Sequence, residues 1–264
     1  MLNQSETPKQ TSSRRRPGSI LSPINSIDFD FRRNDDDGES GNIFIYIIGA
    51  IFLIGILTAL VRGSSTPGSG IDREELILKA SQVRAYAAEL ERGVSFVLRN
   101  AHSETEISFA HPNHSSAYGT YGTTPTAEVF HPSGGGVEWR DNDTDIQTQD
   151  EDWIFNARNR VEEVGQNSGG GPDTTELIAF LPYVTQDFCI AVNESVGVTN
   201  PSDIPPQDIV EVQITSHFFT GSYAGGFLIS SPGDELDGKL EGCLEGDTTP
   251  PSGTYHYYKV LLAR

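Results

Sequence analysis

The feature that most constrains this chain is an uncharged apolar segment, IFIYIIGAIFLIGILTALV, at residues 43–61. Thr58 is the only plainly polar side chain among these 19 residues. As a helix it would extend roughly 28 Å, close to the hydrocarbon thickness of a bilayer, which is about 30 Å. A buried core helix is rarely apolar on every face, and a cleaved signal peptide has a shorter apolar run nearer the start. The sequence therefore predicts a single transmembrane helix over residues 43–61.

Charge and cysteine positions predict how this segment is oriented. Residues 1–42 carry six Lys and Arg, whereas the 20 residues after the segment carry three, and cytoplasmic flanks are the more basic ones. Residues 43–264 carry 30 acidic and 12 basic side chains. The chain's two cysteines, Cys189 and Cys243, lie in this later part, and an oxidising compartment would let them form one disulfide. We therefore expect a cytoplasmic N-terminus, an extracytoplasmic C-terminal domain, and a bond between these two cysteines.

The overall charge limits the partners that the chain can have. It carries 37 acidic and 18 basic side chains, a formal net charge of −19. Such a chain repels phosphate backbones, so sequence-independent binding to nucleic acid is excluded. Membrane lipid is the partner that the apolar segment predicts.

The segments on either side of the apolar run are predicted to lack a core of their own. Residues 1–42 are polar with scattered hydrophobic residues, which predicts a disordered cytoplasmic arm. The arginines at positions 14–16 could contact anionic lipid, although a charge cluster that sets topology is the simpler interpretation. Residues 62–70 include GSSTPGSG, a flexible linker in which Pro67 prevents a continuous helix.

A long amphipathic helix is predicted over residues 72–100. Its small and aliphatic residues recur at spacings of three and four, which places them on one stripe. This stripe could form a coiled-coil seam between subunits, but packing against the protein's own sheet is the more common role of such a stripe. The stripe consists of Leu76, Ala80, Val83, Ala87, Leu90, Val94 and Val97.

Beyond residue 105, the pattern changes to short β-branched or aromatic runs separated by Gly, Pro, Asn and Asp. The stretch HPSGGGVEW at 131–139 predicts two strands joined by a glycine turn, and 176–184 fits either a strand or a short helix. The segment 153–164 is ambiguous. Residues 71–264 are therefore expected to form one acidic α+β domain, with the long helix packed on a mostly antiparallel sheet. The expected strands lie at 106–110, 127–131, 136–140, 176–184, 187–193, 208–215 and 254–264.

Several stretches, taken together, resemble a group of little-characterised pilin-like bacterial membrane proteins. They include GNIFIYIIGAIFLIGILTAL, ASQVRAYAAELERGVSFVLRN, HPSGGGVEW, DFCIAVN and GTYHYYKVLLAR. The general layout is similar to that of type IV pilins and type II secretion pseudopilins. This resemblance implies an inner-membrane protein with a domain facing the periplasm. Those families carry a glutamate at the fifth position after the glycine at which they are cleaved. Here Tyr46 takes that position after Gly41, and Ile43 takes it after Gly38. The sequence therefore leaves open whether the protein forms filaments or stays monomeric.

The strongest local signal for a ligand is DNDTDIQTQDED at residues 141–152. Asp141, Asp143 and Asp145 alternate as in a calcium-binding loop, and Asp152 falls at its twelfth position. Ile146, however, occupies the position that needs glycine, which favours a solvated acidic loop over a calcium site. The loop pair His111 and His114 could share a metal, but polar surface is the simpler interpretation.

The sequence contains no catalytic signature that we recognise. We therefore expect a non-enzymatic, membrane-anchored envelope protein without a required cofactor, whose acidic periplasmic domain serves self-assembly or contact with an envelope partner. The alternative is a monomeric, tethered periplasmic domain that acts as a binding module or adaptor.

Overall fold

The computed structural model describes residues 47–54, 56, 73–141, 143–165, 174–209 and 211–264. The chain divides into two compact units, Met1–Pro67 and Gly68–Arg264. The predicted arm at 1–42 and linker at 62–70 lie outside the described residues, as do residues 43–46 and 57–61 of the predicted span. Residues 47–54 are helical, and among the described residues no helix is both long enough and apolar enough to cross a membrane. The membrane span therefore stays a prediction.

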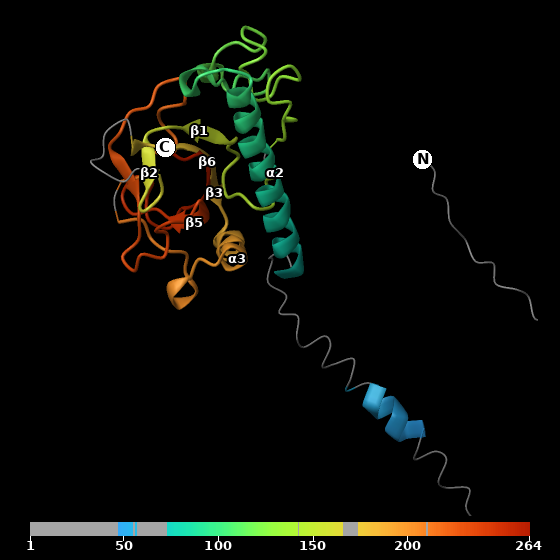
Figure 1. Ribbon diagram of the computed structural model, residues 1–264. Helices are drawn as coiled ribbons and strands as arrows, with labels where there is room; N and C mark the ends of the chain where they lie inside the picture. The colour runs from blue at the N-terminus through green and yellow to red at the C-terminus, as the bar shows by residue number, and fades with distance from the viewer. Residues whose placement is uncertain (1–46, 55, 57–72, 142, 166–173, 210) are drawn as a thin grey trace, which may run out of the picture. The chain divides into compact units, whose positions relative to one another are not determined.

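The second unit contains a four-stranded antiparallel sheet (Figure 1). Its strand order is β1 (Ile154–Asn156), β3 (Leu177–Val184), β6 (Tyr255–Leu262) and β5 (Glu241–Glu245). A separate parallel pair joins β2 (Asn159–Val161) to β4 (Phe227–Ile229). The expected α+β class with a mostly antiparallel sheet is confirmed.

The central strand β3 is apolar throughout because both of its faces are covered. Leu177, Ala179 and Leu181 belong to a core on one side of the sheet, and Ile178 and Phe180 belong to a core on the other side. Side chains alternate between the faces of a strand, so a continuous apolar run indicates burial on both. The segment that could have been a helix is therefore a strand.

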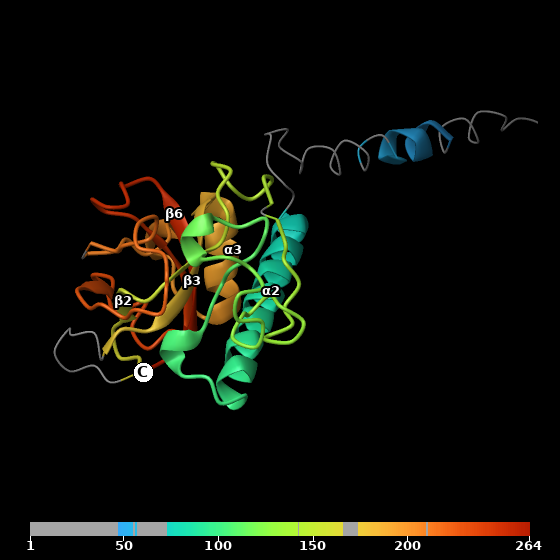
Figure 2. The same ribbon diagram turned by 90° about the horizontal axis from the view of Figure 1, so that it is seen from above.

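The long helix α2 (Arg73–Arg99) covers one face of the sheet beside α3 (Gln186–Val196), as Figure 2 shows. Six of the seven predicted stripe residues are buried, and Val83 is partly buried against the same core. The helix therefore packs on its own sheet, as expected. Ion pairs of Arg84 on α2 with Glu241 on β5, at 2.6 Å, and of Lys259 on β6 with Glu91 on α2, at 3.0 Å, connect helix and sheet.

Residues 187–193, predicted as a strand, instead form most of α3. The Thr185 side chain caps the helix by accepting a hydrogen bond from the Phe188 N–H, and Gly197 ends it in the left-handed conformation. Phe188 and Val192 lie four residues apart and are both buried. A short apolar run fits a strand or a buried helix, and these cap residues were the signal that distinguished them.

The stretches 106–110, 127–131, 136–140 and 208–215 also form no strand within their described residues. Their apolar side chains, such as Ile107, Phe109, Val129 and Val137, are buried in the core, but the backbone runs through turns and isolated bridges. The glycine turn at 131–139 does fold back, since the Val137 N–H donates to the Val129 carbonyl. Short 3-10 helices in the described connecting segments include η1 (Glu104–Glu106), η2 (Ser116–Tyr118) and η4 (Pro201–Asp203).

Candidate functional site

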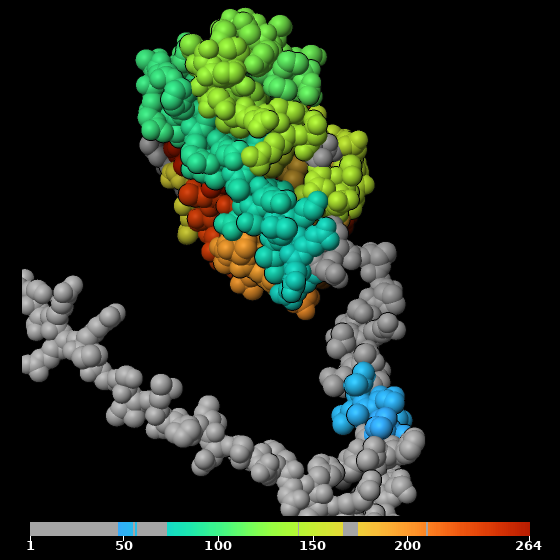
Figure 3. All heavy atoms as spheres, turned by 90° about the vertical axis from the view of Figure 1, so that its right-hand side faces the viewer, coloured from blue at the N-terminus to red at the C-terminus, as the bar shows by residue number. Residues whose placement is uncertain are grey.

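One side of α2 borders two hollows that both have Arg140 in their lining. The helix positions that line them recur every three or four residues, so they follow a single side of the helix. Opposite the helix lies the loop segment that contains the glycine turn and the acidic residues. Figure 3 shows this side of the molecule, with α2 beside green and yellow-green loop residues. We call this surface the α2 face, and its helix positions are Lys79, Gln82, Val83, Tyr86, Glu89, Arg92, Gly93, Phe96 and Arg99.

The first hollow, which we call the acidic pocket, has a volume of about 360 Å³. Aromatic and aliphatic side chains line its interior, among them Tyr86 and Trp153, whose rings meet edge to face at 5.5 Å. Charged side chains from α2 and from the acidic loop complete the lining. Apolar walls with a few polar groups are typical of small-molecule sites.

Lys79 organises the acidic loop. Its ammonium group donates to Asp143 and lies 3.3 Å from Asp145. The hydrogen bond to Asp143 is the main effect that raises the pKa of Lys79. The Trp139 indole N–H donates to Asp141 at 2.9 Å. The Lys79 ammonium group therefore lies beside Asp143 and Asp145, where a calcium ion bound by these carboxylates would lie.

The fourth residue of the calcium hypothesis is Asp152. It is half-buried, and desolvation raises the pKa of its carboxyl group. Among the described residues, which leave out position 142 of this loop, no group of three or more His, Cys, Asp or Glu side chains could hold a metal ion. Calcium binding by Asp141, Asp143, Asp145 and Asp152 stays a prediction.

The second hollow, which we call the arginine groove, is open and has a volume of about 560 Å³. Arg92, Phe96 and Arg99 are exposed on successive turns of α2 along this groove. Arg92 and Arg99 donate to carbonyl groups of their own helix, those of Ala88 and Ser95. Within the described part of the chain, neither arginine forms an ion pair. Three arginines and two glutamates, Glu89 and Glu138, line the groove, and Glu89 pairs with Arg140. The groove therefore keeps an excess of positive charge on a strongly acidic protein.

Arg140 lies between the two hollows and lines both. Its guanidinium group donates to Glu89 at 2.7 Å and sits 4.7 Å from the centre of the Tyr86 ring. This combination of an ion pair and a cation–π contact fixes the side chain against α2.

Glycines determine how closely the loop approaches α2. A Cβ atom on Gly93 would lie 2.5 Å from a methyl group of Val137, so only glycine allows this contact without a shift. A Cβ atom on Gly135 would lie 2.4 Å from the Val129 carbonyl oxygen. The glycine turn seen in the sequence therefore builds one wall of the arginine groove.

His111 and His114 contact backbone and aromatic groups of the fold. The two ring nitrogens of His114 lie 3.2 and 2.9 Å from the carbonyl oxygens of Phe109 and Trp153. His111 stacks on Trp139. The contacts of His114 with these two carbonyl groups thus connect its loop to the start of β1.

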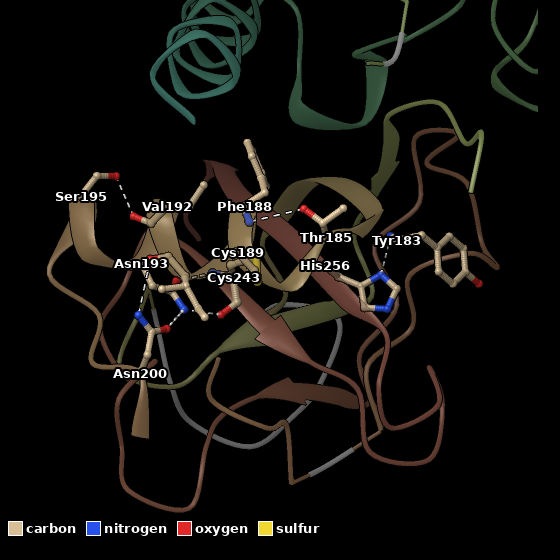
Figure 4. The surroundings of a disulfide bond; sticks show 11 residues. Tyr183, Thr185, Phe188, Cys189, Val192, Asn193, Ser195, Asn200, Cys243 and His256 are labelled. Atoms are coloured by element: carbon tan, nitrogen blue, oxygen red, sulfur yellow. Dashed lines mark hydrogen bonds between the residues drawn. A yellow bond between two sulfur atoms is a disulfide. The ribbon is translucent and has the colours of Figure 1, made fainter. Parts of the chain in front are cut away.

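The predicted disulfide between Cys189 on α3 and Cys243 on β5 is present, with both residues fully buried (Figure 4). Asn193, one turn after Cys189, reinforces it. The Asn193 amide accepts from the Cys243 N–H at 2.8 Å and donates to the Cys243 carbonyl at 3.0 Å. Helix α3 thus holds β5 by one covalent bond and two hydrogen bonds, and sequence reasoning missed the amide.

The chemistry of the α2 face suits binding. Among the described residues that line its two hollows there is no Ser, Thr, Cys or His, whereas Arg and aromatic side chains are frequent. Arg and aromatic residues are enriched at protein interfaces. Comparison with known proteins adds no relative, because no family model, no curated protein and no solved structure matches the chain.

Proposed function

We propose that this chain is a non-enzymatic, pilin-like protein of a bacterial envelope, anchored in the inner membrane by residues 43–61. Its N-terminal arm lies in the cytoplasm, and its acidic domain, residues 71–264, faces the periplasm. The α2 face of that domain serves assembly or contact with a partner.

The observation that carries this proposal is the apolar segment and the exposure of its described part. Ile51, Phe52 and Leu53 follow one another in a helix and are 64%, 70% and 62% exposed. Consecutive helix positions point about 100° apart, so large apolar side chains surround the helix. Soluble monomers rarely leave such a surface uncovered, and a bilayer would cover it.

Two further features support the compartment and the architecture. A buried disulfide fits a domain that folds in an oxidising compartment such as the periplasm. An amphipathic helix packed on an antiparallel sheet fits the layout that the pilin-like resemblance implies.

Membrane anchoring can be tested with charges placed in the apolar segment. The variant Ile51→Lys/Ile54→Lys should leave the alkaline-carbonate-resistant membrane fraction, because each central lysine costs about 3 kcal/mol on insertion. The matched control is Ile77→Lys/Leu78→Lys, which adds the same charges at two exposed apolar positions of α2. The control should stay membrane-bound. An anchor at 43–61 is contradicted if both variants leave the membrane fraction. It is also contradicted if both variants stay in it.

One observation favours the alternative, a monomeric tethered binding domain. The acidic pocket combines an aromatic interior with Lys79, Gln82 and Arg140, and its volume of about 360 Å³ is within the range of small-ligand sites. A strict monomer in which Tyr86→Ala abolishes binding of a polar small molecule would support this alternative.

A further inference from the structure

Charge is divided along the α2 face in a way that no other feature of the fold explains. Near the start of α2, Asp143 and Asp145 pair with Lys79, and Asp141 lines the same pocket. Near its end, Arg92 and Arg99 are exposed without an ion pair among the described residues. One surface therefore carries an acidic half and a basic half, arranged along a single helix.

We propose that the α2 face binds the α2 face of a second copy of this chain, with the two helices antiparallel. In this two-fold contact, Asp141 and Asp145 of each copy meet Arg92 and Arg99 of the other. The inference rests on the proposed function, in which this face serves assembly, and it names the partner.

The spacing along α2 fits such a two-fold contact. Gln82, which lines the acidic pocket, and Phe96, which lines the arginine groove, lie 14 residues apart on the same side of α2, roughly 21 Å along the helix. The position midway between them is Glu89, whose side chain pairs with Arg140 at 2.7 Å. When two antiparallel helices cross at this midpoint, the acidic half of each copy faces the basic half of the other.

A second copy explains both halves together, which a single acidic partner does not. An isologous interface uses the same patch on both subunits, so the patch must be complementary to itself. The α2 face meets this condition because the carboxylates at one end and the arginines at the other carry opposite charge. Two copies would then neutralise two sets of carboxylates and two sets of arginines at once.

The side chains between the charges are suited to an interface. Phe96 is 48% exposed and lies between Arg92 and Arg99 on successive turns. Aromatic and arginine side chains dominate the binding energy of many protein interfaces. In the antiparallel contact, Phe96 of one copy would lie opposite the Lys79 region of the other.

The test measures the oligomeric state of the full chain in a mild detergent by sedimentation. We expect a dimer with a micromolar dissociation constant in 50 mM salt, weakened at least about tenfold in 500 mM salt because the paired charges are screened. The variant Arg92→Glu/Arg99→Glu and the variant Asp141→Lys/Asp145→Lys should each be monomeric at concentrations where the wild type is dimeric.

An equimolar mixture of the two variants gives the sharpest result. In the mixed pair, glutamates of one groove meet lysines of the other loop, and the remaining arginines meet the remaining aspartates. Both contacts are then attractive, so the mixture should form a heterodimer although neither variant dimerises alone. Arg73→Glu is the matched control for Arg99→Glu, since it reverses an exposed charge on the same helix outside the face, and it should leave the dimer intact.

Three outcomes would overturn the inference. The wild type could remain monomeric up to about 100 µM in low salt, well above micromolar affinity, in which case the groove serves a different partner. Arg73→Glu could weaken the dimer as much as Arg99→Glu does. The two charge-reversed variants, each folded by circular dichroism and each with its disulfide intact, could also fail to associate when mixed. None of these outcomes alters the membrane fractionation result, so the two proposals fail separately.

Discussion

Replacing Glu176 by Gln should change how the stability of the domain depends on pH. The Glu176 carboxylate is fully buried next to β3 and accepts a hydrogen bond from the Val161 N–H at 3.0 Å. Burial raises its pKa from 4.5 to about 7, although this hydrogen bond and the charges of Arg160 and Arg264 act in the opposite direction. The folded protein therefore holds this proton more tightly than the unfolded chain does.

The size and sign of the effect follow from these pKa values. The contribution of Glu176 to stability is complete below pH 4.5, where the carboxyl is protonated in both states, and it is lost as the pH rises through 7. The difference of about 2.5 in pKa corresponds to a loss of about 3 kcal/mol. Gln keeps an acceptor for the Val161 N–H and has no proton to lose. The variant should therefore gain up to about 3 kcal/mol on the wild type between pH 5 and pH 8.

Urea unfolding at pH 5, 6, 7 and 8 measures this effect. The chain's two tryptophans, Trp139 and Trp153, both lie in the acidic domain, so their fluorescence reports its unfolding in the full chain. The difference between variant and wild type isolates Glu176 from the other titrating groups. A difference that stays constant from pH 5 to pH 8 would refute the assignment of a neutral, buried carboxyl group.

Three further predictions use the same unfolding assay. Cys189→Ser removes a disulfide whose cysteines lie 54 residues apart, and it should lower the unfolding free energy by about 4 kcal/mol. It should also leave Cys243 as a free thiol that is alkylated in the unreduced, denatured protein. An unchanged stability would contradict this prediction. Asn193→Ala leaves the N–H and carbonyl of Cys243 without their hydrogen-bond partner and should lower the unfolding free energy by roughly 2 to 4 kcal/mol. The control Asn100→Ala, at an exposed position, should lower it little. Burial lowers the pKa of His256 from 6.5 to about 3, so its contribution to stability is complete above pH 6.5 and is lost as the pH falls towards 3. His256→Gln should flatten that acid loss, and an equally steep loss in the variant would assign it to other groups.

The sequence predicted those parts of the fold where periodicity extends over many residues. The stripe from Leu76 to Val97 extends over most of the 27-residue helix α2, and only one side of a helix satisfies that spacing. The run at β6 was also predicted as a strand, whereas the run at β3 fitted either a strand or a short helix and is a strand covered on both faces. The pairing of Cys189 with Cys243 needed no geometry, since the chain has two cysteines.

Short segments were predicted less well, for physical reasons. Five to eight apolar residues satisfy a strand and a buried helix equally, so the assignment of 187–193 depended on caps at Thr185 and Gly197. Phe109 and Val129 belong to loops, yet their side chains are buried in the core. Buried loop residues alternate with exposed ones, and this pattern resembles that of a strand.

The α2 face could not be found from the sequence because its two halves come from distant segments. Arg92, Phe96 and Arg99 lie off the buried stripe and look like ordinary surface residues of an amphipathic helix. Their significance appears only when the glycine turn and Arg140 are placed opposite them, more than 35 residues further along the chain. The acidic loop was recognised, but its partner Lys79 was not.

The orientation of the domain is tested most directly by labelling single introduced thiols in intact spheroplasts. Ser133 is exposed in the acidic domain, and Ser12 lies in the N-terminal arm. With Cys189 and Cys243 bonded to each other, a membrane-impermeant maleimide should modify only the introduced cysteine, and the wild type serves as the blank. We predict that Ser133→Cys is labelled in intact spheroplasts and that Ser12→Cys is labelled only after the membrane is permeabilised. Labelling of Ser12→Cys alone, or of both variants before permeabilisation, would contradict a membrane-anchored protein whose acidic domain faces the periplasm.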